Sequence, residues 1–103
     1  MNYRVFFSPE AQADLTELYD YIARHSEEDR ALGYIERIEE WINGLESFPE
    51  RGTRRDDIRP GLRVAGFERR VSIAFQVGTE SVTILRILYA GRDLEKTLGE
   101  PEV

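Results

Sequence analysis

The sequence predicts an α+β domain: an N-terminal strand, an antiparallel helical hairpin and a C-terminal antiparallel β-meander, in the order β-α-α-β-β-β. Two patterns support this prediction. Apolar residues recur at helical spacing in two stretches between residues 9 and 45, and between Ser72 and Val77 they alternate with a period of two. A length of 103 residues suits one domain spanning 1–103, whose tail beyond about residue 98 we expect to be frayed.

The first strand and the first helix are marked by local signals. Residues 3–7 (YRVFF) are aromatic and β-branched, and Ser8-Pro9-Glu10 follows them. A serine can cap the free amides of a helix, proline suits its first position, and an acid favours the positive end of its dipole. The helix should end near His25, whose ring we expect to cap the last carbonyls.

A second helix is predicted from Glu28 to Leu45, ended by Gly44 and then Pro49. With the first helix it should form an antiparallel hairpin. Both helices carry apolar stripes too broad to be covered by the other helix alone, so both should also pack on the sheet. Tyr34 and Trp41 lie in the second stripe and are expected to be core residues unless a partner groove takes them.

Three strands should follow, at residues 62–67, 72–77 and 82–89, with a hairpin loop at residues 78–80. The last strand is apolar on both faces, with Ile84 and Leu88 expected on one face and Leu85 and Ile87 on the other. Such a strand should be central and covered on both sides. Only Arg86 interrupts it, and an unpaired cation there would be costly, so it should pair with an acid or point to a rim.

Composition limits the chemistry that this chain can perform. There is no cysteine and His25 is the sole histidine, so we expect no thiolate or His-rich metal site and no cofactor. No apolar run approaches the roughly 20 residues of a membrane span, and we expect a cytoplasmic protein. Neither a nucleophilic triad nor a Gly-rich phosphate loop is present. The paired Asp56 and Asp57 lie among arginines, so salt bridges explain them more simply than acid–base catalysis.

Charge is divided unevenly along the chain. The first 50 residues hold 12 acids and 4 arginines, whereas residues 51–93 hold 5 acids and 9 arginines. Any anionic partner should therefore meet the second half, although the acids can also be read as simple solvation of two helices. Arginine suits phosphate and carboxylate groups because its planar fork donates two hydrogen bonds. The arginines on or beside the predicted sheet are Arg59, Arg63, Arg69, Arg70, Arg86 and Arg92.

The ordered set of motifs resembles the ParE branch of the RelE/ParE toxin superfamily over residues 3–95. These motifs are the initial strand, the helix starting Ser8-Pro9-Glu10-Ala11, then Ile58-Arg59-Pro60-Gly61-Leu62-Arg63, Ile84-Leu85-Arg86-Ile87-Leu88 and Gly91-Arg92-Asp93. The resemblance implies the toxin of a type II toxin–antitoxin module, held inactive by a neighbouring antitoxin. ParE-like toxins act on DNA gyrase, whereas RelE-like relatives cut mRNA in the ribosome.

The choice between these activities depends on catalytic residues. Arg63 and Arg92 match basic positions of the RelE-like nucleases, but the tyrosine expected about six residues past Arg92 is replaced by Leu98. Tyr89 could substitute for it, but a phenol pKa of about 10 suits base catalysis poorly. The isoelectric point of about 4.8 calculated from the sequence also departs from the basic charge common in this superfamily and disfavours attraction to RNA. We therefore favour a binding inhibitor over an enzyme.

The resemblance, the arginines and the helix stripes together define expectations for partners. We expect gyrase inhibition by binding, with a ribosome-dependent mRNA endoribonuclease using Arg63, Arg92 and Tyr89 as the alternative, and a degenerate toxin as a third interpretation. The antitoxin is expected to be a ribbon-helix-helix protein, ParD-like, on an apolar groove of the helices. The target-binding residues are Arg59, Arg63, Arg69, Arg70 and Arg92, and the antitoxin-binding residues are Leu18, Tyr19, Tyr34 and Trp41.

Overall fold

The computed structural model describes residues 2–89 of the 103-residue chain, and within them it confirms the α+β order predicted from the sequence. The elements are β1 (Arg4–Phe7), α1 (Pro9–His25), α2 (Glu28–Asn43), the short 3₁₀ helix η1 (Gly44–Glu46), β2 (Thr53–Arg54), β3 (Leu62–Phe67), β4 (Val71–Val77) and β5 (Ser81–Tyr89). Arg92 and the tail expected to fray lie outside the described residues.

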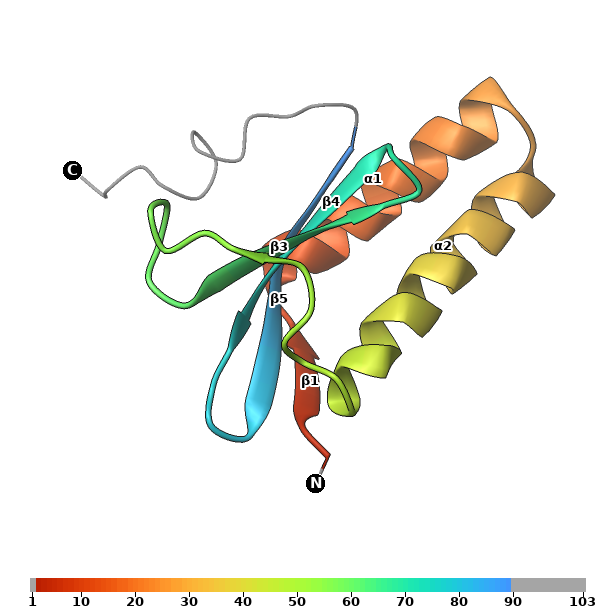
Figure 1. Ribbon diagram of the computed structural model, residues 1–103. Coiled ribbons are helices and arrows are strands. Elements are labelled where there is room, and N and C mark those ends of the chain that lie inside the picture. The colour runs from red at the N-terminus through yellow and green to blue at the C-terminus, as the bar shows by residue number, and fades with distance from the viewer. Residues whose placement is uncertain (1, 90–103) are drawn as a thin grey trace.

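The sheet has five strands in the order β1-β5-β4-β3-β2 (Figure 1). Strands β3, β4 and β5 form the predicted antiparallel meander. Strand β1 joins it in parallel at the free edge of β5, with Arg4 opposite Ser81 and Phe7 opposite Ile84, so the sheet is mixed. The chain between β1 and β5, which includes the helical hairpin, provides the long connection that a parallel pair needs.

Strand β2 was not predicted, because two residues are too few to show an alternating pattern. It pairs with β3 through Thr53 opposite Val64. Gly52 makes this close approach possible: its φ is +73°, and a Cβ on it would lie 2.5 Å from the Val64 carbonyl oxygen. Only glycine combines that backbone conformation with that contact.

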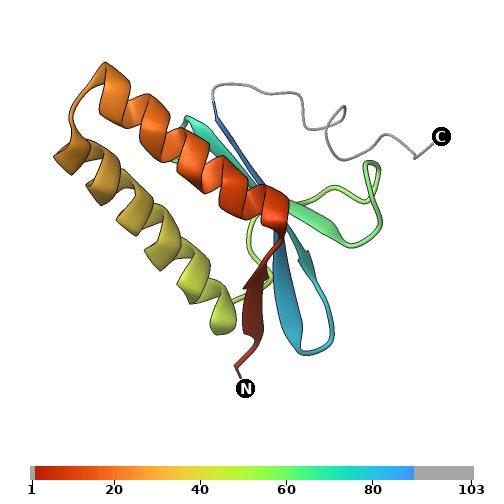
Figure 2. The same cartoon turned by 180° about the vertical axis from the view of Figure 1, so that it is seen from behind.

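Both helices lie on one face of the sheet, seen from opposite sides in Figures 1 and 2. The main core forms between the two helices and the sheet. This confirms the prediction that both apolar stripes, being too broad to be covered by the other helix alone, also pack on the sheet. The fully buried large side chains of this core include Ile38 and Ile42 from α2, Phe75 from β4 and Ile84 from β5. Burying each such side chain contributes roughly 1.5–3 kcal/mol. Tyr34 and Trp41 are half-buried and pack against this core.

The opposite face of the sheet carries a smaller apolar cluster. Leu62 and Ala74 are buried there, and Ile58, from the loop before β3, packs against them with Val64 and Leu85. The sheet is therefore covered on both faces in this region, as the doubly apolar last strand predicted.

Because β5 contains a β-bulge, its side chains are not divided between the two faces of the sheet as predicted. Ala74 lies opposite Arg86 while the next residue, Phe75, lies opposite Ile84, so one extra residue, Leu85, is inserted in β5. The alternation therefore changes phase, and Ile84 and Ile87 both join the main core instead of lying on opposite faces. The prediction was wrong because a strict period of two cannot reveal an inserted residue.

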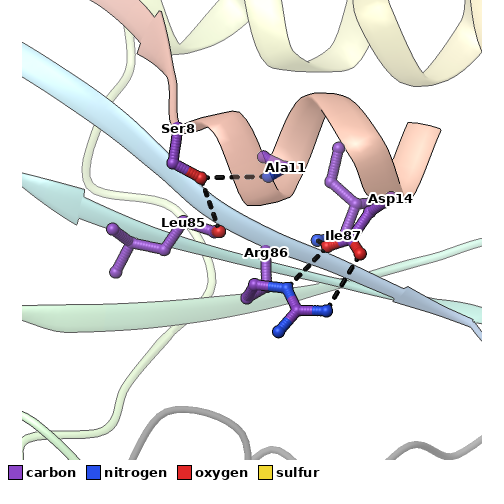
Figure 3. A network of polar contacts seen from close by, with 6 residues as sticks. All are labelled: Ser8, Ala11, Asp14, Leu85, Arg86 and Ile87. Atoms are coloured by element: carbon purple, nitrogen blue, oxygen red, sulfur yellow. Dashed lines mark hydrogen bonds and ion pairs between the residues drawn. The ribbon is translucent and has the colours of Figure 1, made fainter. Parts of the chain in front are cut away.

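Backbone groups at and beside the bulge form hydrogen bonds with side chains at the start of α1 (Figure 3). Ser8 caps α1 by accepting a hydrogen bond from the Ala11 amide at 3.0 Å, and its hydroxyl donates to the Leu85 carbonyl at 2.8 Å. Two turns later, Asp14 accepts hydrogen bonds from the Ile87 amide at 2.8 Å and from Arg86. Strand β1 has ended by this point, so these side chains take over hydrogen bonding along that edge of β5.

The remaining helix ends agree closely with expectation. The Nδ1 atom of His25 lies 2.8 Å from the Tyr21 carbonyl oxygen, so the ring caps the last turn of α1 as predicted. Helix α2 ends at Asn43 rather than Leu45, because Gly44 leads into the 3₁₀ turn η1. Within the described residues, no helix combines the length and apolar character needed to cross a bilayer. In the same part of the chain, no three potential metal-ligating side chains gather.

Candidate functional site

The arginines proposed to contact a target lie at different places around the sheet. Arg59 is exposed in the loop before β3, Arg63 is half-buried within β3, and Arg69 and Arg70 are exposed in the turn between β3 and β4. Arg63 lies opposite Phe75, whereas Arg70 directly precedes Val71 at the other end of β4. At 3.3 Å per residue, the four-residue step from Val71 to Phe75 corresponds to about 13 Å. These arginines therefore form two groups, one at each end of β3.

Arg63 is held by the segment that enters β2. Its Nε atom donates a hydrogen bond to the Arg51 carbonyl oxygen at 2.8 Å. The guanidinium of Arg51 lies over the Trp41 ring, 5.3 Å from the ring centroid, and Trp41 makes an edge contact with Phe75. This cation–π contact places a positive charge beside one of the proposed antitoxin-binding residues.

The turn that presents Arg69 and Arg70 is strained and is held from α2. Glu68 and Arg69 have φ angles of 47° and 64°, a left-handed backbone conformation that residues other than glycine seldom adopt. Arg37 donates two hydrogen bonds to the Glu68 carboxylate, at 2.9 and 3.0 Å. This bidentate contact fixes the turn and holds the pKa of Glu68 below its usual value.

Acidification should release this contact. Because the folded-state pKa of Glu68 is lowered, the stability that the pair provides is present above the ordinary glutamate pKa and is lost as pH falls through the folded value. We expect the melting temperature of wild type to fall more steeply below about pH 4 than that of Glu68→Gln, which lacks the titrating group. Identical slopes for the two proteins would contradict a stabilising pair.

Two of the side chains named for the nuclease alternative, Arg63 and Tyr89, are not brought together among residues 2–89, and the third, Arg92, lies outside these residues. Tyr89 lies opposite Val71, at the end of β4 remote from the Arg63–Phe75 pair. Its ring contacts Tyr21 of α1, with centroids 5.2 Å apart, and Tyr21 in turn stacks on His25 at 4.2 Å. Tyr89 and His25 therefore belong to an aromatic cluster beside α1, while Arg63 lies beside β2.

The proposed antitoxin-binding residues occupy different depths of the hairpin. Leu18 is only 4% exposed and belongs to the core, so it can pack beneath a binding surface but cannot contact a partner directly. Tyr19 lines a groove of about 360 Å³ between the two helices. Tyr34 and Trp41 lie elsewhere, packing edge-on against Phe67 and Phe75 of the sheet.

The hydroxyl of Tyr34 is buried and has no hydrogen-bond partner in the described part of the chain. Burial, followed by the nearby Glu68 carboxylate, raises the pKa of Tyr34, so the phenol keeps its proton. An unsatisfied buried hydroxyl costs about 1–3 kcal/mol. The ring itself is well placed, between the Arg37 guanidinium at 5.3 Å and Phe67.

Tyr34→Phe should therefore raise the free energy of unfolding by about 1 kcal/mol, since it removes the hydroxyl and keeps both ring contacts. Urea denaturation measures the change, and Tyr19→Phe, at a half-buried tyrosine of the open groove, serves as the control with little expected change. A clear loss of stability in Tyr34→Phe would mean that the hydroxyl has a partner such as an ordered water.

Comparison with known proteins gives a consistent result. Residues 5–94 match the family model described as the ParE toxin of the type II toxin–antitoxin system parDE. The chain is 30% identical over 97 residues to Toxin ParE3 of Caulobacter vibrioides, covering 94% of this chain and 96% of that protein. It is 28% identical over 98 residues to Toxin ParE1 of Mycobacterium tuberculosis, covering 95% and 100%.

A solved structure shares the fold as well. It is described as the chromosomal ParDE toxin–antitoxin system of P. aeruginosa, and it superposes with a TM-score of 0.75 at 28% sequence identity. The match covers 86% of this chain and 97% of the other. Most of the chain is therefore shared with that structure.

Proposed function

Because this chain belongs to the ParE toxin family of type II toxin–antitoxin systems, we propose that it arrests growth by binding DNA gyrase in the cytoplasm until a cognate antitoxin neutralises it. The antitoxin is proposed to be a ribbon-helix-helix protein, and the toxin acts as an inhibitor without cutting a covalent bond.

The separation of Arg63 from Tyr89 is the observation that supports binding over cleavage. General acid–base catalysis on RNA needs a proton-transferring group within hydrogen-bond reach of the reacting atoms, next to the cations that stabilise the phosphate. Arg63 lies opposite Phe75 and Tyr89 opposite Val71, four positions apart along β4, and the imidazole of His25 is engaged at the end of α1. The charge balance, with a net charge of −6, also disfavours long-range attraction to RNA.

Purified gyrase provides the direct test. Supercoiling of relaxed plasmid should fall as the folded protein is added, and it should recover when the protein encoded beside this chain is added in excess. Expression of the toxin alone should arrest growth and induce the DNA damage response. Normal supercoiling at a molar excess of folded toxin, together with cleavage of ribosome-bound mRNA, would replace gyrase inhibition with the nuclease. Unaffected growth despite soluble expression would instead indicate a degenerate toxin.

A further inference from the structure

We propose that the groove between α1 and α2 binds a basic amphipathic helix of the antitoxin, whose lysines or arginines face an acidic rim on α2. This inference rests on the proposed pairing with an antitoxin and adds the chemistry of the segment that is bound. It predicts that the antitoxin segment bound by this toxin is positively charged.

The floor of the groove is apolar. Leu15 and Tyr19 of α1 and Ile35 of α2 line it, and Gln12, Thr16 and Glu39 complete its walls. Leu32, one turn before Ile35 in α2, is 51% exposed and extends the apolar surface toward the start of α2. A channel between two antiparallel helices with exposed apolar side chains suits the apolar face of a third helix.

On the α2 side of the groove, the acidic side chains follow one side of the helix. Leu32, Ile35 and Glu39 recur at three- and four-residue spacing and therefore share one side of α2, and Glu28 and Glu36 each lie four residues from Leu32. These three glutamates, the acidic rim, are exposed, and the 11-residue step from Glu28 to Glu39 corresponds to about 16 Å along the helix. The polar side chains that α1 contributes to the groove lining are the uncharged Gln12 and Thr16, and the exposed Asp20 lies one turn after Thr16.

None of the three rim glutamates forms an ion pair with any residue from 2 to 89. The arginines of α2 are engaged elsewhere: Arg37 pairs with Glu68, and Arg30 lies 3.6 Å from Glu27. An acidic helix on this groove would meet three like charges without neutralisation, which is unfavourable. A basic helix would neutralise them, and three turns would be long enough to reach from Glu28 to Glu39.

Charge reversal tests the inference on the intact complex. The dissociation constant is measured for the antitoxin encoded beside this chain with wild type, with Glu36→Lys/Glu39→Lys, and with Glu10→Lys/Glu17→Lys. The last pair makes the same charge change at exposed positions of α1, and Glu17 lines a different pocket, beside Ile87. The rim variant should bind at least about tenfold more weakly than the control variant, and high salt should reduce this difference.

Equal affinities of the rim and control variants, with melting curves that show both are folded, would overturn the basic-helix inference. Tighter binding of the rim variant would also overturn it, because the bound segment would then be acidic. These results are distinct from failure of the proposed function. If wild type neither binds the neighbouring protein nor is neutralised by it in cells, antitoxin pairing itself is contradicted.

Discussion

Replacing Asp14 with alanine should lower the free energy of unfolding by about 3–5 kcal/mol, toward the lower end of that range. The Asp14 side chain is 4% exposed and accepts hydrogen bonds from Arg86 Nε at 2.8 Å, from Arg86 Nη2 at 2.9 Å and from the Ile87 amide at 2.8 Å (Figure 3). Alanine would leave a cation and a backbone amide without their acceptor. The Arg86 side chain keeps 23% exposure, so water can compensate part of the loss.

Urea denaturation with an unchanged m-value would measure this effect. Glu17→Ala, an exposed acid on the same helix, is the control and should change stability by no more than about 0.5 kcal/mol. If Asp14→Ala does not fold, Asp14→Asn retains an acceptor for the Ile87 amide and should show a smaller loss. Adding Arg86→Met to Asp14→Ala should cost less than the sum of the two single changes, because the unpaired cation is removed. A stable Asp14→Ala protein would contradict the role assigned to this pair.

Reversing the charges of Arg69 and Arg70 to glutamate should weaken gyrase inhibition by about tenfold or more. Both arginines are exposed at the tip of the β3–β4 turn, and neither forms an ion pair with the other described residues. A turn that is held by the Arg37–Glu68 contact can present its guanidinium groups to an acidic surface in a fixed geometry. A glutamate pair there would repel the same surface.

The concentration that halves supercoiling is the measured quantity for this variant. Arg24→Glu is the control for a single charge reversal, since Arg24 is exposed on α1 and likewise forms no ion pair within residues 2–89. Thermal melts must show that both proteins are folded. Inhibition equally strong in the turn variant and in the Arg24 variant would remove Arg69 and Arg70 from the target surface and direct attention to Arg59 and Arg63.

The candidate site could be predicted in part. Arginine composition alone indicated Arg59, Arg63, Arg69 and Arg70, but the sequence could not show that they separate into two groups at the ends of β3. That separation follows from strand register, which long-range packing sets. From the sequence, the glutamates of the acidic rim could be interpreted only as solvation of a helix. A helical pattern does not reveal which of the charged residues of a helix will border a neighbouring helix. The Tyr19 groove depends on the distance between two helices, which their separate sequences do not specify.

The sequence by itself determined the helices and the main strands of this fold. It also indicated that the charge of Arg86 could not stay unpaired within an apolar strand. Ser8 and Pro9 begin α1, the apolar periods distinguish helices from strands, and Arg86 within an apolar strand has to pair with an acid or reach a rim. These are local properties, set by capping, periodicity and the cost of burying charge. Only the tertiary structure decided that the acid is Asp14, 72 residues away, that Leu85 forms a bulge and that β1 runs parallel to β5. Each of these depends on contacts between distant segments, and local patterns specify which surfaces must be buried but not which surfaces will meet.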